Sequence, residues 1–147
     1  MGEKVVLLVE DNPDDEALCI RALRKANIKN EIVVAHDGQE ALDLLFGAKC
    51  PVPIKPAVVL LDLKLPKLDG VETLTRIRAN PMTRTLPVVM LTTSDQDTDI
   101  ARAYASGANS YVRKPIDFNE FTNVATQLGI YWLLINKEPG VEATAGG

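Results

Sequence analysis

The sequence predicts an α/β fold in which a doubly wound parallel sheet is covered by helices on both faces. Two observations indicate this fold: strand and helix signals alternate five times along the chain, and two apolar runs, Val5–Val9 and Val58–Leu61, are short and continuous. Continuous apolar runs of this length are typical of strands that are buried on both faces. Strands that alternate with helices form βαβ units, and such units imply a parallel sheet.

The first two strand–helix units are bounded by turn and capping signals. Asp11-Asn12-Pro13 follows the strand at Val5–Val9 and is a helix-start signal. A second strand is expected over Glu31–Ala35, and Asp37-Gly38 turns the chain into a second helix. The inward positions of these two helices are marked by Cys19, Ile20, Leu23 and Ala26 and by Ala41, Leu42 and Leu45.

The later elements continue the alternation to residue 128. We expect a strand at Val58–Leu61, a helix from Gly70 onward, a strand at Leu86–Leu91, a helix at Asp97–Ser106, a strand at Ser110–Arg113 and a helix over Phe118–Leu128. Residues 1–128 form the predicted domain. Residues 129–147 form a C-terminal extension, apolar at 130–135 and then expected to be disordered. A proline-rich loop at Gly47–Pro56 has no assigned role.

Composition excludes several classes of function. The chain has 147 residues and a formal net charge of −4, with no basic run, which argues against nucleic acid as a partner. The two cysteines form no disulfide framework or zinc spacing, and there is no signal peptide or membrane-spanning run. We therefore expect a cytoplasmic protein without a membrane partner. The length is also too short for this domain and a standard output domain, so a stand-alone domain is expected.

Carboxylates follow two of the predicted central strands. Glu10 and Asp11 come directly after the first strand, and Asp62 follows Leu61. In open α/β sheets the functional crevice lies outside the carboxyl ends of the strands, so these acids are expected to meet there. Three acids in one crevice repel one another unless a cation joins them. The pattern therefore predicts a divalent-metal site with a reactive aspartate.

The other strand ends add a hydroxyl and a cation to this crevice. Thr92 follows the fourth strand and Lys114 the fifth. This set suits phosphoryl transfer, with Asp62 as the nucleophile and with Mg²⁺ or Mn²⁺ held by Asp11, Asp62 and a nearby backbone carbonyl. Lys114 and Thr92 would bind phosphoryl oxygens. No GxxxxGK[ST] or GxGxxG motif follows any strand, so the usual nucleotide cradles are absent from the sequence.

With these residues in this order, the chain resembles a response-regulator receiver domain, the phosphoacceptor half of two-component signalling. The resemblance covers about Lys4 to Leu128 and rests on four motifs: Val-Glu-Asp-Asn at 9–12, Leu-Leu-Asp-Leu-Lys-Leu-Pro-Lys-Leu-Asp-Gly at 60–70, Leu-Thr-Thr at 91–93 and Lys-Pro at 114–115. It implies a flavodoxin-like (βα)5 fold with strand order 2-1-3-4-5. It also implies a switch that takes a phosphoryl group from a sensor histidine kinase, rather than an enzyme that turns over a separate substrate.

The resemblance assigns a role to each matching residue. It implies the phosphoacceptor at Asp62, metal ligation by Asp11, Asp62 and the backbone carbonyl of Lys64, and a water-mediated metal contact from Glu10. It further implies a switch hydroxyl at Thr92, a switch aromatic at Tyr111, a phosphoryl-binding lysine at Lys114 and a cis peptide bond before Pro115.

Three features depart from the common receiver pattern and are similar to features of the regulators that partner bacterial phytochromes. They are Leu65 before Pro66, the proline-rich loop and the Trp-containing extension. The resemblance thus implies a phytochrome as the partner kinase. A downstream protein or a homodimer would read the switch, and the dimer contacts are expected at Tyr131, Trp132 and Ile135.

Other interpretations of the same residues remain open. Asp14, Asp15 and Glu16 are expected to be helix-start charges rather than ligands. His36 is expected to be a surface residue without a functional role. A hydrolase that uses Asp62 as a phosphoenzyme nucleophile and an unphosphorylated binding module are the alternative functions. The apolar segment at 130–135 can also fold back on its own domain.

Overall fold

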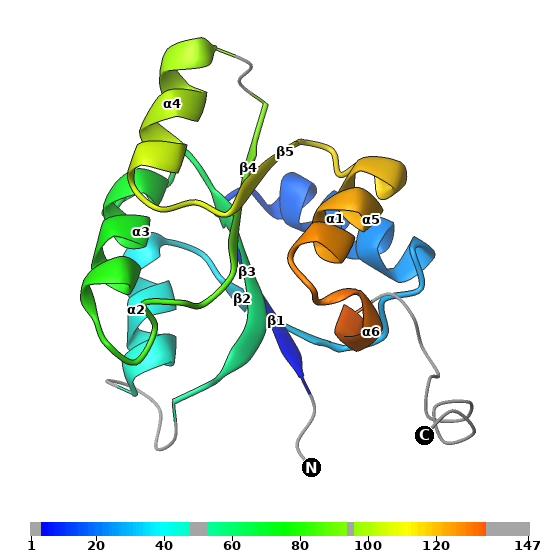
Figure 1. The fold of residues 1–147 in the computed structure, drawn as a ribbon, viewed down its shortest axis with the longest axis horizontal. Helices are drawn as coiled ribbons and strands as arrows, with labels where there is room; N and C mark the ends of the chain where they lie inside the picture. The colour runs from blue at the N-terminus through cyan, green and yellow to red at the C-terminus, as the bar shows by residue number, and fades with distance from the viewer. Residues whose placement is uncertain (1–3, 48–52, 94–95, 135–147) are drawn as a thin grey trace.

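The computed structural model describes residues 4–47, 53–93 and 96–134, which form one five-stranded parallel sheet (Figure 1). The order of the strands is β2-β1-β3-β4-β5, so the predicted flavodoxin-like arrangement is confirmed. The strands are β1 (Val5–Val9), β2 (Glu31–Ala35), β3 (Pro56–Asp62), β4 (Val88–Thr92) and β5 (Ser110–Arg113).

Helices cover both faces of the sheet. Figure 1 shows α2, α3 and α4 on one side of the strands and α1, α5 and α6 on the other. The helices are α1 (Pro13–Lys25), α2 (Gly38–Phe46), α3 (Gly70–Ala79), α4 (Asp97–Ala105), α5 (Phe118–Gln127) and α6 (Tyr131–Leu134).

The central strands are apolar up to their carboxyl ends because both of their faces are buried. Leu8 and Leu60 lie in the core that packs against α1, α5 and α6. Their neighbours Leu7 and Leu61 lie in the core that packs against α2, α3 and α4. Successive side chains of a strand point to opposite faces, so a continuous apolar run serves two cores at once.

The strand order places a crevice between the carboxyl ends of β1 and β3. From β1 the chain continues to β2 on one side, and β3 pairs with β1 on the other. Ligand crevices of doubly wound sheets form at such a reversal of the strand order. Because Val9 pairs with Leu61, the residues that follow these two positions leave the sheet at the same level.

Local capping signals set the starts of the helices that flank this crevice. The side chain of Asn12 accepts hydrogen bonds from the backbone amides of Asp14 and Asp15, and the backbone of α1 begins at Pro13. A short polar side chain at this position satisfies amides that the first helical turn leaves unpaired. Equivalent caps are formed at α2, α3 and α5 by Asp37, Asp69 and Asp117.

The fourth strand begins two residues later than the sequence predicts, at Val88 rather than Leu86. The carbonyl of Leu86 accepts a hydrogen bond of 2.7 Å from the Nη1 atom of Arg78 instead of joining the sheet. Its amide donates to the carbonyl of Thr83, which closes a turn. Both backbone groups of Leu86 are thus bound outside the sheet, and Pro87, which has no amide to donate, precedes the first strand residue.

The segment that follows α5 packs onto its own domain. Ile130 and Leu134 are buried in the same core as residues of α1 and α5, whereas Leu133 is 43% exposed. Of the expected dimer contacts, Tyr131 is half-buried, and the Trp132 side chain and Ile135 lie outside the described residues. The expected disorder at 137–147 and part of the proline-rich loop also lie outside them. Within residues 4–47, 53–93 and 96–134, no helix has the length and apolarity needed to cross a bilayer.

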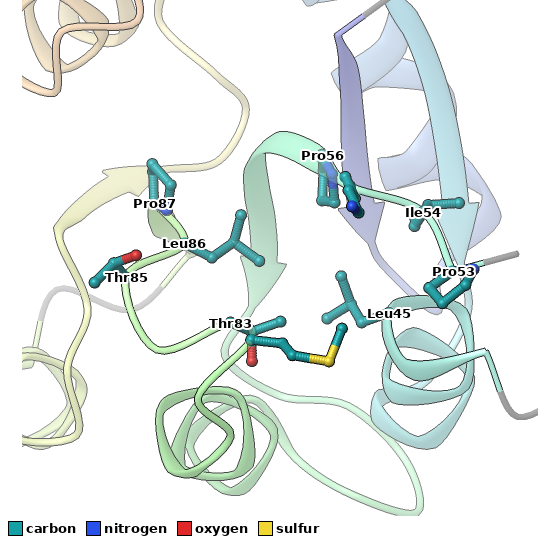
Figure 2. A pocket seen from close by; sticks show the side chains of 10 residues that line it. Leu45, Pro53, Ile54, Pro56, Thr83, Thr85, Leu86 and Pro87 are labelled. Carbon is teal, nitrogen blue, oxygen red and sulfur yellow. The ribbon is translucent and has the colours of Figure 1, made fainter. Parts of the chain in front are cut away.

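A hollow of about 460 Å³ lies at the edge of the sheet opposite the crevice (Figure 2). Pro56, which begins β3, and Pro87, which precedes β4, lie on its wall with Leu45, Ile54 and Leu86. Apart from two threonines and Lys55, its lining is apolar. The hollow is thus separate from the acidic crevice.

Candidate functional site

The predicted site residues converge because the strands are in register at their carboxyl ends. Asp62 is the last residue of β3 and pairs with Leu91 of β4. Thr92 ends β4, and its carbonyl accepts a hydrogen bond of 2.9 Å from the amide of Lys114. Glu10 follows β1, and its amide donates to the carbonyl of Ala35 in β2. The sheet therefore delivers these side chains to one edge.

Lys114 is the centre of the site. Its ammonium Nζ lies 2.6 Å from Oε1 of Glu10, 2.9 Å from Oδ2 of Asp15 and 3.3 Å from Oδ2 of Asp62. The Lys114 side chain is only 7% exposed. A buried charge is tolerated only where opposite charges and hydrogen bonds compensate its lost hydration, and three carboxylates do so here.

Glu10 is the most deeply buried acid of the site, with no exposed surface. Its Oε1 atom faces Lys114, while Oε2 accepts a hydrogen bond of 3.1 Å from the amide of Asn12. Both carboxylate oxygens are therefore held in place. Because Asn12 also caps α1, the start of this helix and the position of Glu10 are linked.

The acids suit a divalent cation. Carboxylate oxygens of Glu10, Asp11 and Asp62 all lie within 4.8 Å of one another. A set of carboxylate oxygens is what hard cations such as Mg²⁺ and Mn²⁺ prefer. Asp11 is exposed, whereas Glu10 and Asp62 are buried, so the cluster opens to solvent on the side of Asp11. The residues present thus fit a metal at the predicted place.

The pKa of Asp62 is raised to about 7 from its ordinary value of 3.8. Burial is the largest cause, and the neighbouring charge of Glu10 adds to it, while Lys114 opposes both. Burial also lowers the pKa of Lys114, but the hydrogen bonds and charges of Glu10, Asp15 and Asp62 outweigh it and hold that pKa above its ordinary value. Without a metal, the charged form of the Asp62 carboxyl is consequently disfavoured at neutral pH, whereas Lys114 keeps its charge.

This pKa predicts a pH-dependent effect of Asp62→Asn on the metal-free protein. A carboxyl whose pKa is higher in the folded than in the unfolded state destabilises the fold as pH rises from about 4 to about 7. Asparagine carries no charge and avoids this cost. We expect the variant to gain in free energy of unfolding over the wild type by up to ~1.4 kcal/mol per pH unit across that range, with a constant difference above it. Urea unfolding with a chelator at several pH values measures the difference.

Asp69→Asn is the matched control for this measurement. Asp69 is exposed and caps α3 through a hydrogen bond from the amide of Glu72, a role that asparagine also fills. Its difference from the wild type should stay small across the same pH range. A difference for Asp62→Asn that does not change with pH would contradict the raised pKa.

The remaining predicted residues occupy different depths around the crevice. Thr92 is buried and 3% exposed, and Tyr111 is half-buried on β5. Lys64 is exposed two residues past Asp62. The peptide bond between Lys114 and Pro115 is cis, as the resemblance implies.

A glycine allows the chain to fold closely under the end of β3. A Cβ atom at Gly70 would collide with the carbonyl oxygen of Asp62, and the amide of Gly70 donates a hydrogen bond of 3.0 Å to the carbonyl of Leu63. The turn that follows Asp62 therefore requires glycine where α3 begins.

The contact of Asp15 with Lys114 is not predicted from the sequence. Asp15 is expected to be only a helix-start charge, but it binds Lys114. A signal was available: Asp15 lies four residues before Cys19 and eight before Leu23, both of which are buried. Residues four apart share one face of a helix, so Asp15 is on the face of α1 that turns toward the sheet. His36 instead lies at the surface near Glu16 and Glu40.

Comparisons with known proteins identify the family. Residues 6–126 match the family model described as the response regulator receiver domain. The probable methanogenesis regulatory protein FilR2 of Methanothrix harundinacea (strain 6Ac) is 40% identical over 136 residues, which cover 92% of this chain and 88% of the relative.

Two solved structures are similar in both sequence and fold. The bacteriophytochrome response regulator AtBRR is 47% identical with a TM-score of 0.82, and the match covers 93% of this chain and 100% of AtBRR. The Mn²⁺-bound form of response regulator Rcp1 is 34% identical with a TM-score of 0.71, covering 88% and 94% of the two chains. From the family match, the fold and the acidic crevice together, the chain belongs to the response regulator receiver domain family, the phosphoacceptor switches of two-component signalling.

Proposed function

We propose that Asp62 is the phosphoacceptor of this receiver and that Glu10, Asp11, Thr92 and Lys114 serve its phosphorylation. The observation that carries the proposal is the position of the Asp62 carboxylate between a lysine ammonium at 3.3 Å and two acids that can share a metal with it. An oxygen of Asp62 attacks the phosphorus of a phosphohistidine. A P–O bond forms, the P–N bond breaks, and its electron pair leaves with the imidazole.

The charges around Asp62 explain why a cation is required. The transferring group is anionic and would approach three carboxylates, of which Lys114 compensates only one charge. Asp11, Asp62 and the backbone carbonyl of Lys64 would hold Mg²⁺ or Mn²⁺, with Glu10 acting through water. The ion supplies charge neutralisation of the phosphoryl oxygens. The similar response regulator Rcp1 has a Mn²⁺-bound form, which supports the proposal that this chain also binds a divalent metal.

The chain's own residues then sense the new group. Lys114 donates a hydrogen bond to one phosphoryl oxygen and the hydroxyl of Thr92 to another. Tyr111 lies on β5, the strand that pairs with the strand of Thr92. When Lys114 and Thr92 move to bind the phosphoryl oxygens, the Tyr111 side chain also changes position and alters the surface beside β5. A modification shifts such an equilibrium only through contacts that differ between the two states, and these two hydrogen bonds are the difference. A downstream protein or a second copy of the chain reads the altered surface.

The partner that donates the phosphoryl group is a sensor histidine kinase, and we propose a bacterial phytochrome as its class. The name of AtBRR, a bacteriophytochrome response regulator at 47% identity, supports this assignment. FilR2, at 40% identity, is named for the regulation of methanogenesis. Similarity at this level therefore extends to regulators named for other processes.

Incubation with acetyl phosphate and Mg²⁺, followed by intact-mass measurement, tests the function. We expect one phosphate adduct per chain, at Asp62, because both oxygens of Glu10, the other buried acid of the cluster, are already bound by Lys114 and by the amide of Asn12. Chelation of the metal before the phosphodonor is added should prevent the adduct, and adding Mg²⁺ or Mn²⁺ back should restore it.

The same reaction distinguishes the alternatives. Steady release of inorganic phosphate from a phosphate ester at enzymatic rates would favour a hydrolase over a switch. No adduct with any small phosphodonor or with a phosphorylated histidine kinase would favour an unphosphorylated binding module and contradict the proposal.

A further inference from the structure

Lys114 has more acidic partners than its role as a phosphoryl sensor needs. An ammonium group carries three N–H donors. In this structure Glu10, Asp15 and Asp62 accept hydrogen bonds from Nζ at 2.6, 2.9 and 3.3 Å. Each donor is therefore already engaged before any phosphoryl group is present. A new hydrogen bond to a phosphoryl oxygen requires Lys114 to release one carboxylate.

The three partners are not equally free to be released. Glu10 is fully enclosed by the protein and is held through its other oxygen by the amide of Asn12. Asp62 carries the phosphoryl group itself and stays beside the lysine. The side chain of Asp15 is 37% exposed, compared with 1% for Glu10 and 10% for Asp62. Water can solvate Asp15 once it is released, so its release costs the least.

Space for this movement exists next to the pair. A hollow of about 70 Å³ is bordered by Asp15, Leu18, Cys19, Thr93, Lys114 and Pro115. A water molecule has a share of roughly 30 Å³ in the liquid, so the hollow has room for water between the two side chains as they separate.

We infer that Asp15 is a positioning residue that holds Lys114 in the unphosphorylated state and competes with the phosphoryl group for it. The inference rests on the proposed function and adds a residue that sets the balance of the switch. Phosphorylation breaks the hydrogen bond between Asp15 and Lys114, so a stronger hydrogen bond makes the phosphorylated state less favourable. The ion pair also joins α1 to the end of β5, so its loss frees that contact when the switch is on.

Asp15→Asn should raise the proportion of phosphorylated protein. A neutral amide accepts a weaker hydrogen bond from Lys114, and one negative charge is removed from beside the incoming group. We expect the ratio of phosphorylated to unphosphorylated chain, at a fixed concentration of acetyl phosphate and Mg²⁺, to rise roughly three- to tenfold, the range that weakening one half-exposed charge-assisted hydrogen bond supports. Beryllofluoride, a phosphoryl mimic, should bind more tightly by a similar factor.

Asp14→Asn is the matched control. Asp14 is the neighbouring acid in the same helical turn, it is exposed, and Lys114 contacts Asp15 instead. It makes the same change in net charge, so it measures the general effect of charge on Mg²⁺ and phosphodonor binding. Equal ratios for Asp14→Asn and Asp15→Asn would overturn the inference.

A double-mutant cycle with Lys114→Met tests whether the effect passes through the lysine. When Lys114 is absent, Asp15→Asn should change the phosphorylated ratio no more than Asp14→Asn does. A persisting three- to tenfold rise would show that Asp15 acts without Lys114 and would also overturn the inference.

Failure of the proposed function is distinguishable from failure of this inference. If the wild type takes up no phosphate and binds no beryllofluoride, the proposed function fails. If the wild type is phosphorylated and only the difference between the two asparagine variants is missing, Asp15 is an anchor of α1 and nothing more. An anchor would lower the thermal stability of Asp15→Asn and leave the ratio unchanged.

Discussion

Replacing Asp62 by asparagine is expected to abolish the phosphate adduct while the protein stays folded. Asparagine has nearly the same shape, but its amide oxygen is a poor nucleophile and a weaker metal ligand than a carboxylate. Both the reacting oxygen and one metal ligand are lost together. Because the pKa of Asp62 is raised by burial and by Glu10, the neutral side chain also relieves electrostatic strain, so the loss is not a consequence of unfolding. Intact mass after acetyl phosphate and Mg²⁺ measures the adduct.

Asp69→Asn serves as the control for this reaction as well. It makes the same chemical change at an exposed cap of α3, outside the cluster of acids, and should take up phosphate as the wild type does. An adduct on Asp62→Asn at the wild-type level would place the phosphoacceptor elsewhere. Fragmentation of the phosphorylated wild type would then show which residue carries it.

Replacing Lys114 by methionine is expected to destabilise the metal-free protein strongly at pH 8. Methionine keeps most of the apolar stem of the side chain and removes the charge. Glu10 and Asp62, which are buried, then lose the cation at 2.6 and 3.3 Å. Breaking a buried ion pair by removal of one partner costs roughly 3–5 kcal/mol, because the other charge stays buried without compensation. In a domain of this size that corresponds to a fall in melting temperature of about 10 °C or more.

The way in which this loss of stability changes with pH and with Mg²⁺ identifies its cause. The pKa of Lys114 lies above its ordinary value, so its stabilising charge is present throughout the range from pH 5 to 9. At pH 5, below the raised pKa of Asp62 of about 7, the Asp62 carboxyl binds a proton, and the loss should shrink. Mg²⁺ should raise the melting temperature of Lys114→Met more than that of the wild type, because a competing positive charge is gone from the cluster.

Lys29→Ala is the control for the removal of a lysine, because Lys29 is exposed. We expect it to change stability by less than about 0.5 kcal/mol, as is usual for surface substitutions. A loss for Lys114→Met that is as small, or that neither pH nor Mg²⁺ alters, would contradict the view that Lys114 neutralises the buried acids.

Several features of the fold could be predicted because their causes lie within a few residues. Continuous apolar runs predicted the central strands, and Asp11-Asn12-Pro13 and Asp37-Gly38 predicted the starts of α1 and α2, which Asn12 and Asp37 cap in the structure. The ends of an element are harder to predict where a side chain from another element binds its backbone. β4 starts at Val88 rather than at Leu86, whose carbonyl accepts a hydrogen bond from Arg78 of α3.

The helices differ in how much of their packing the local pattern reveals. The face of α5 is predicted by its apolar spacing, and Phe121, Val124 and Ala125 are indeed buried. On α4, Ala103 is buried while Tyr104 is 47% exposed. The residues of this short helix that face the sheet are thus set by how the neighbouring elements place it.

The sequence by itself determined the α/β class, the order of elements and the presence of acids, a hydroxyl and a lysine at strand ends, because these depend on local periodicity and on the geometry of parallel sheets. Only the tertiary structure decided which acids bind the lysine. Lys114 is 104 positions from Glu10, 99 from Asp15 and 52 from Asp62. Contacts over such separations depend on how α1 packs against the sheet and on which carboxylates that packing buries. That is why Asp15 has the appearance of a helix-start charge in the sequence and is a partner of Lys114 in the folded protein.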